Sequence, residues 1–124
     1  MYKAIKNNSP INIKDLDTFV DGASVRKVGD TTFEIAKKMD ISDIKVIENG
    51  LLCHEMIQLY QEDGIITEPA GCLSIAALNF IDKKELEGKN VVCIISGGNN
   101  DIMRYPEILE KNLIYLGIKH YYII

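Results

Sequence analysis

The stretch that decides the fold is Val91-Val92-Cys93-Ile94-Ile95-Ser96-Gly97-Gly98-Asn99-Asn100-Asp101. Its first five residues are apolar, and turn residues follow them directly. A continuous apolar run bounded by turn residues is typical of a strand that a parallel sheet buries on both faces. The run therefore predicts a strand whose carboxyl end, where such sheets bind ligands, is the Ser-Gly-Gly-Asn turn.

This turn has two interpretations. Gly97 and Gly98 would let the backbone come close to a flat or anionic ligand, and the Ser96 hydroxyl can both donate and accept hydrogen bonds. A tight connection from strand to helix would use the same glycines only for their backbone angles. The turn by itself favours neither interpretation.

The composition limits the class of protein. The chain has 124 residues, of which 47% are hydrophobic and 26% charged, as expected of one globular domain with a buried core. Its net charge is -4, and the lysines are scattered among acidic residues, which argues against nucleic acid as the main partner. Apolar runs of about five residues are far shorter than the ~20 that span a bilayer. We therefore expect a cytoplasmic protein with no membrane partner.

The cysteines and histidines give no sign of a metal site. Cys53, Cys72 and Cys93 are widely spaced in apolar settings, which indicates reduced core residues. There is no CxxC pair, and His54 and His120 are isolated in the sequence. We expect no bound metal.

Helical and extended patterns alternate along the chain. Helices are predicted over 31–39, over 48–62, from Pro69 onward and from Pro106 to Leu116, and short strands over 44–47, 91–95 and 118–124. Thr31 and Glu34 have the spacing of a capping box, and Thr67 is placed to cap the helix at Pro69. The alternation indicates an α/β fold class, with a mainly parallel sheet and flanking helices.

A second segment is expected beside the turn. Glu68-Pro69-Ala70-Gly71 opens a helix at a junction predicted on the same edge of the sheet as Ser96 to Asn99, so the two segments could line one pocket. Taken singly, Glu68 is an acid that the helix dipole favours in a first turn. Asn99 to Asp101 would cap the next helix, although Asn99 could also face a ligand.

Three segments together resemble the threonine dehydratase (threonine ammonia-lyase) family. They are Phe19 to Val25 with Val28-Gly29-Asp30, then Glu68 to Gly71, then Ile95 to Asp101, in matching order and spacing. Residues 113–122 resemble the biosynthetic form at the point where it enters an ACT-like regulatory domain. The resemblance implies that residues 1–116 are the C-terminal portion of the catalytic domain and that 117–124 begin a linker or first strand of the regulatory domain.

The resemblance also implies a fold, a cofactor and a reaction. The fold is the tryptophan synthase β-like type (fold type II), in which pyridoxal 5'-phosphate lies between two α/β lobes and forms a Schiff base with a lysine. The family converts L-threonine to 2-oxobutanoate and ammonia in isoleucine biosynthesis. A serine at the place of Ser96 hydrogen-bonds the pyridine nitrogen there, and a neutral hydroxyl makes the ring a milder electron sink than a carboxylate would. Gly97, Gly98 and Asn99 would form the wall beside the ring, with Glu68 and Gly22 near it.

Two motifs of that family do not occur in this sequence. They are the Ser-Phe-Lys type motif that holds the Schiff-base lysine and the glycine-rich loop that holds the phosphate, so we assign no catalytic residue here. The leading hypothesis is a fragment of the lyase that binds an amino-acid substrate only in the full enzyme and associates into a homo-oligomer. The alternatives are a non-catalytic binding or assembly module derived from the fold, and part of a serine dehydratase or racemase.

We predict that the purified 124-residue chain does not turn over threonine, because the base that must deprotonate the substrate is not among its motifs. The measurement is 2-oxobutanoate release during a titration with pyridoxal phosphate. Release of 2-oxobutanoate together with a visible absorption band of bound cofactor would contradict this prediction.

Overall fold

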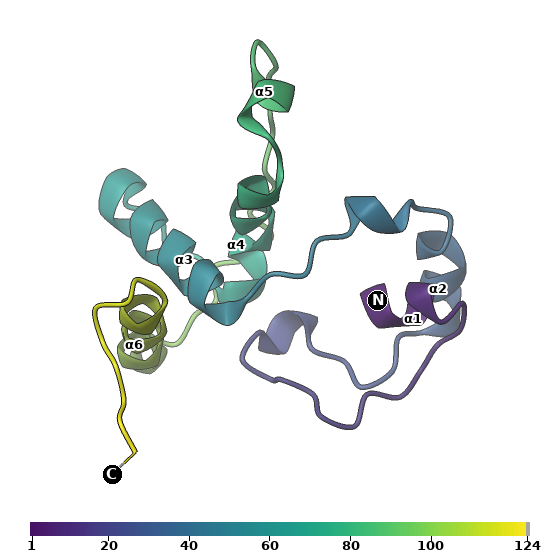
Figure 1. Cartoon of the computed structure of the whole chain (residues 1–124), viewed down its shortest axis with the longest axis horizontal. Coiled ribbons are helices and arrows are strands. Elements are labelled where there is room, and N and C mark those ends of the chain that lie inside the picture. Colours follow the sequence, from purple (N-terminus) through teal and green to yellow (C-terminus); the bar gives the residue numbers. More distant parts are fainter. Residues whose placement is uncertain (124) are drawn as a thin grey trace. The chain divides into compact units, whose positions relative to one another are not determined.

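The computed structural model describes residues 1–123, which fall into two compact units (Figure 1). The first unit is Met1–Val46 and the second is Ile47–Ile124. The helices of each unit pack against one another, and each unit has its own buried side chains.

The first unit is built from short helices. They are α1 (Tyr2–Lys6), the 3-10 turn η1 (Asp21–Ala23), α2 (Asp30–Ala36) and the 3-10 turn η2 (Ile41–Asp43). α1 contacts α2 and η2. The core of this first unit is small and consists of the buried residues Ala4, Phe19 and Phe33.

The helix predicted over 31–39 is present but begins differently. The residue before its first turn is Gly29, and no side chain caps it, so the predicted Thr31–Glu34 capping box is wrong. Thr31 lies inside the first turn, where its hydroxyl cannot take the capping position. The Thr32 hydroxyl instead donates a hydrogen bond of 2.9 Å to the Gly29 carbonyl.

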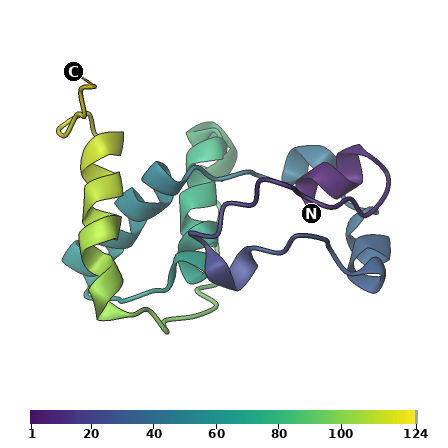
Figure 2. The same cartoon turned by 90° about the horizontal axis from the view of Figure 1, so that it is seen from below.

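The second unit is organised around a long central helix. The helices are α3 (Asn49–Asp63), α4 (Pro69–Ala76) and α6 (Tyr105–Tyr115), joined by η3 (Ala77–Phe80), α5 (Lys83–Leu86) and η4 (Ile102–Arg104). α3 packs against both α4 and α6, as Figure 2 shows from a second direction. The fully buried side chains of this unit come from all three helices and include Leu52, Cys53, Cys72, Ala76 and Ile108.

The predicted helices of this unit are confirmed. Gly64 and Gly117 end α3 and α6 with φ of 68°, a backbone conformation that glycine adopts without strain. Pro69 lies in the first turn of α4, as predicted, although the residue before that turn is Glu68 and not Thr67. The buried residues of α3 are Leu51, Leu52, Cys53, Met56 and Ile57, whereas Tyr60 is 50% exposed.

The predicted strands are absent from residues 1–123. The segments 44–47, 91–95 and 118–123 have no regular secondary structure. Val92 and Ile94 are 85% and 74% exposed, which is the opposite of the predicted burial on both faces. A strand exists through backbone hydrogen bonds to a neighbour, and no described segment pairs with these three in that way. The predicted sheet is therefore not observed.

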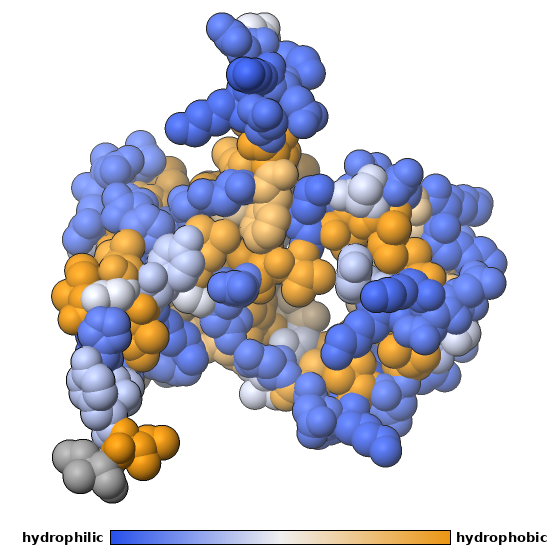
Figure 3. Space-filling model, viewed as in Figure 1, coloured by the Kyte–Doolittle hydropathy of each residue, from blue (hydrophilic) through white to orange (hydrophobic). Residues whose placement is uncertain are grey.

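Large apolar side chains reach the surface of the second unit. Figure 3 shows hydrophobic residues on the arm that carries α5. Phe80, before α5, and Val91, Val92 and Ile94, after it, are exposed. Their exposure leaves apolar area that burial against other atoms would stabilise. None of the helices in residues 1–123 has the length and apolar character needed to cross a membrane.

We predict that Ile108→Ala lowers the free energy of unfolding by about 2–5 kcal/mol, because the Ile108 side chain is fully buried and its truncation leaves a cavity between α6 and α3. Leu109→Ala is the matched control, since Leu109 lies on the same helix and is 46% exposed. Urea unfolding monitored by circular dichroism measures both. Equal losses in the two variants would contradict the assigned core.

Candidate functional site

The two segments predicted to share a pocket lie side by side in the second unit. The backbone N–H of Glu68 donates a hydrogen bond of 3.1 Å to the Gly97 carbonyl. One residue further along, a Cβ added at Gly98 would lie 3.1 Å from the Ile66 carbonyl oxygen. The start of α4 therefore lies beside the Ser96–Asn99 turn, as expected, and backbone contacts join them. The shared pocket stays a prediction.

The end of the Glu68 side chain lies against Gly97. A Cβ added there would lie 2.5 Å from Oε1 of Glu68 and 2.6 Å from its Cδ, distances that real Cβ atoms do not show. The carboxylate of Glu68 consequently rests directly against the Gly97 backbone. This contact gives Gly97 a role in packing, which is separate from both interpretations of the turn.

The side of the turn that carries Ser96 is open. Ser96, Gly98 and Asn99 are exposed, and Gly97 is half-buried. An exposed hydroxyl next to a backbone without side chains can meet a flat ring, with the hydroxyl donating to an acceptor atom of the ring. The turn thus has the accessibility that a binding role requires.

Two residues after the turn have different roles: Asp101 caps a helix, and Asn100 has a buried side-chain amide without a hydrogen-bond partner in residues 1–123. The Asp101 carboxylate accepts a hydrogen bond of 2.9 Å from the Met103 N–H at the start of η4, so the predicted capping is confirmed for Asp101. The side-chain N and O of Asn100 are both buried, and neither has a hydrogen-bond partner within residues 1–123. Sequence reasoning assigned Asn100 only a capping role and did not identify its buried amide.

Gly22 lies in the first unit. It is exposed in η1, and its N–H donates a hydrogen bond of 2.9 Å to the Asp21 carboxylate. Its expected place near a cofactor stays a prediction.

Buried thiols lie behind the start of α4. Burial raises the pKa of the Cys53 thiol to about 12. Burial also raises the pKa of the Cys72 thiol to about 11, an effect that the nearby Thr67 hydroxyl partly opposes. These thiols are neutral core groups, as the sequence predicted, and cannot serve as nucleophiles.

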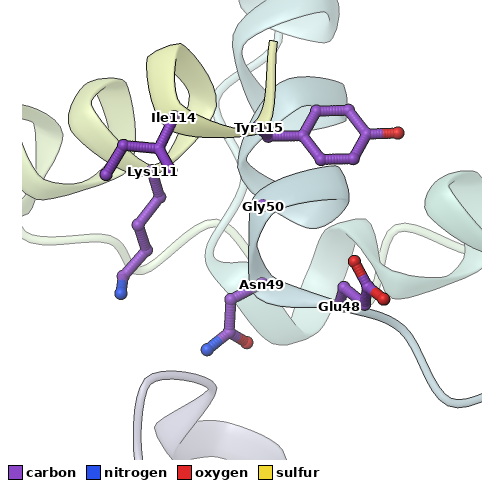
Figure 4. A pocket seen from close by; sticks show the side chains of 6 residues that line it. All are labelled: Glu48, Asn49, Gly50, Lys111, Ile114 and Tyr115. Atoms are coloured by element: carbon purple, nitrogen blue, oxygen red, sulfur yellow. The ribbon is translucent and has the colours of Figure 1, made fainter. Parts of the chain in front are cut away.

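A cavity that the sequence did not predict lies between the start of α3 and the end of α6. It has a volume of about 340 Å³ and is lined by Glu48, Asn49, Gly50, Lys111, Ile114 and Tyr115 (Figure 4). Gly50 allows the two helices to approach, because a Cβ there would lie 2.9 Å from Cβ of Tyr115. The one feature of the sequence that could have indicated this cavity is Gly50, a glycine in the first turn of α3. Among the described residues, no group of three or more His, Cys, Asp or Glu side chains could hold a metal ion.

Comparison with known proteins defines the class of this chain. A family model described as "Pyridoxal-phosphate dependent enzyme" matches residues 1–97. The chain therefore belongs to the family of pyridoxal-phosphate dependent enzymes.

The relatives narrow this class. The chain is 48% identical over 124 residues to "L-threonine dehydratase biosynthetic IlvA" of Halalkalibacterium halodurans. It is 46% identical over 125 residues to the protein of the same name from Staphylococcus aureus (strain NCTC 8325 / PS 47). Both matches cover all of this chain and 29% of the relative, so the chain spans less than a third of the length of these curated relatives. The resemblance drawn from the three sequence segments is confirmed.

A solved structure shows the fold. The processed form of threonine deaminase isoform 2 from Solanum lycopersicum matches with a TM-score of 0.77 and 24% identity. The match covers 89% of this chain and 32% of that one. The chain has the fold of part of a type II pyridoxal-phosphate enzyme, as predicted, although its sheet is not observed in residues 1–123.

We predict that the folded chain exposes a single reactive cysteine. Cys93 is half-buried, whereas Cys53 and Cys72 are fully buried. Labelling with Ellman's reagent at pH 8 should modify Cys93 quickly and the other two only after unfolding in urea, with mass spectrometry assigning the sites. Label on Cys53 or Cys72 of the folded chain would contradict the packing of α3 on α4.

The same burial predicts a dependence of stability on pH. The folded-state pKa values of Cys53 and Cys72, about 12 and 11, lie above their ordinary value of 9.0. The unfolded chain then loses these protons at lower pH than the folded chain. The contribution of the thiols to stability is therefore complete below pH 9 and declines as the pH rises toward 11 and 12.

Proposed function

We propose that this chain is the C-terminal part of the catalytic domain of a pyridoxal-phosphate dependent threonine dehydratase, which converts L-threonine to 2-oxobutanoate and ammonia. The observation that carries the proposal is the identity of 46–48% over the whole chain to relatives named as biosynthetic threonine dehydratases. The contact between Glu68 and Gly97 supports it, because it joins two of the three family segments.

The residues at the turn fit the cofactor. The Ser96 hydroxyl is exposed and can donate to a pyridine nitrogen, and Gly98 beside it presents backbone without a side chain. A Cβ at Gly97 would displace the Glu68 carboxylate, so the wall of this site is built without side chains at its centre. We propose that Ser96, Gly97, Gly98 and Asn99 line the cofactor, with Glu68 behind Gly97.

Pyridoxal phosphate, when bound, supplies the electron sink that stabilises negative charge at the α-carbon of the amino acid. The task of Ser96 in this scheme is to donate one hydrogen bond and to keep its own proton, because a serine hydroxyl is too weak an acid to protonate the ring nitrogen. Gly97 and Gly98 have no side chains, so the flat ring can come close to their backbone. The Glu68 carboxylate packs behind Gly97 and so supports this part of the wall.

The wider organisation is proposed on the same basis. Residues 1–116 belong to the catalytic domain, and 117–124, which follow the end of α6, begin the linker or first strand of an ACT-like regulatory domain. The apolar segment 91–95 forms a strand of a mainly parallel sheet once neighbouring strands are beside it. Exposed apolar surface favours a homo-oligomer, and a small amino acid in the cytoplasm is the expected substrate.

The proposal is tested in a chimera. The matched 29% of the Halalkalibacterium halodurans relative is replaced by this chain, and 2-oxobutanoate release from L-threonine is measured with and without pyridoxal phosphate. We expect cofactor-dependent turnover. Ser96→Ala should lower kcat/KM about tenfold, since a lost hydrogen bond is worth about 1–1.5 kcal/mol.

The control for this experiment is Ser9→Ala, which removes an exposed hydroxyl from the loop after α1 and should leave kcat/KM unchanged. Circular dichroism confirms that each chimera is folded. A folded chimera without threonine turnover would overturn the proposed function, and full activity of the Ser96→Ala chimera would remove Ser96 from the cofactor site.

A further inference from the structure

We propose that Gly71 and Ser74 are positioning residues, which lock the segment 93–98 against α4 and thereby fix the place of the Ser96 hydroxyl. The proposal rests on the proposed function in one respect, that Ser96 is the residue facing the cofactor. The contacts that carry it lie within the second unit and involve residues to which the family resemblance assigned no task.

The first lock is a close approach at Gly71. A Cβ added at Gly71 would lie only 2.2 Å from the Gly97 carbonyl oxygen and 3.0 Å from the Gly97 backbone nitrogen. The contacted atoms are backbone and cannot rotate away as a flexible side chain could. Alanine at this position therefore forces the Gly97 peptide away from α4. This movement breaks the hydrogen bond that the Gly97 carbonyl accepts from the Glu68 N–H.

The second lock is a hydrogen bond one turn further along α4. The Ser74 hydroxyl donates to the Ile94 carbonyl at 2.8 Å, and the Cys93 thiol contacts the Ser74 carbonyl at 3.6 Å. Positions 71 and 74 are three residues apart and lie on the same side of a helix. The same face of α4 thus holds the segment at Cys93, at Ile94 and again at Gly97.

Ser96 lies between these fixed points. Its neighbour Gly97 is held by Gly71 and Glu68, and Ile94 is held two residues before it. The exposed hydroxyl of Ser96 consequently takes its position from the backbone on either side. A change at Gly71 or Ser74 should displace Ser96 although neither residue faces the open side of the turn.

The experiment compares two glycine-to-alanine variants of the full chain by amide hydrogen exchange and ¹⁵N–¹H NMR. In Gly71→Ala we expect the Glu68 amide to exchange at least about tenfold faster and the Ser96, Gly97 and Gly98 signals to shift. Gly50→Ala is the matched control, because its Cβ also meets a close neighbour, Cβ of Tyr115 at 2.9 Å, but in the contact between α3 and α6. It should leave those signals and the Glu68 exchange rate unchanged.

Ser74 provides the second, gentler variant. Ser74→Ala should shift the Ile95 and Ser96 signals, and Ser74→Thr, which retains a hydroxyl, should restore them. Unchanged Ser96–Gly98 signals in both Gly71→Ala and Ser74→Ala would overturn the proposal, as would equal shifts in Gly50→Ala. If Gly71→Ala does not fold, the Ser74 pair decides.

A separate readout keeps the two proposals distinguishable. Equilibrium dialysis with pyridoxal 5'-phosphate measures whether the chain and its variants bind this probe. Weaker binding by Gly71→Ala than by Gly50→Ala supports positioning of Ser96 toward the cofactor. Shifted NMR signals together with equal affinities in the two variants would mean that the lock exists but that Ser96 does not face the cofactor, which counts against the proposed function alone.

Discussion

The site of this protein depends on the Gly97 peptide, which lies in contact with both Glu68 and Gly71. Its carbonyl accepts the Glu68 N–H, its Cα rests against the Glu68 carboxylate, and its oxygen occupies the space where a Cβ of Gly71 would be. A side chain at position 71 would force the two segments apart, whereas one at position 97 would displace the Glu68 carboxylate. Gly71 and Gly97, which are 26 residues apart in the sequence, therefore make one contact, which holds the turn that carries Ser96 beside the start of α4.

The helices could be predicted from the sequence because their signals are local. α3 and α6 follow the spacing of their apolar residues, and Gly64, Pro69 and Gly117 mark ends that depend only on backbone conformation. The capping prediction failed at Thr31 because the helix begins earlier than expected, with Gly29 and not Thr31 in the capping position. The meeting of Glu68 with Gly97 was predicted from the expected edge of a sheet.

The strand predicted at 91–95 is not observed in the described residues, and local sequence signals alone cannot show whether such a strand forms. Its apolar composition is suited to burial on two faces, yet Val92 and Ile94 are exposed, since burial and strand pairing both require other segments alongside. A helix forms its backbone hydrogen bonds within itself, whereas a strand forms them with neighbouring strands. The cavity at Gly50 and the buried amide of Asn100 were missed for a similar reason, because each arises from how segments distant in sequence pack.

Because helices form their hydrogen bonds internally, the segment 91–98 can keep the arrangement of its turn without a sheet. The contacts that hold Ile94 and Gly97 come from α4, a helix that needs no partner strand to form its backbone hydrogen bonds. α4 is in turn packed against α3, with Cys72 and Ala76 fully buried. The order of dependence thus runs from the core between α3 and α4, through the face of α4 that carries Gly71 and Ser74, to the exposed hydroxyl of Ser96. The exposed side chains of Val92 and Ile94 take no part in this attachment, because the contacts with α4 come from the Cys93 thiol and from the carbonyls of Ile94 and Gly97.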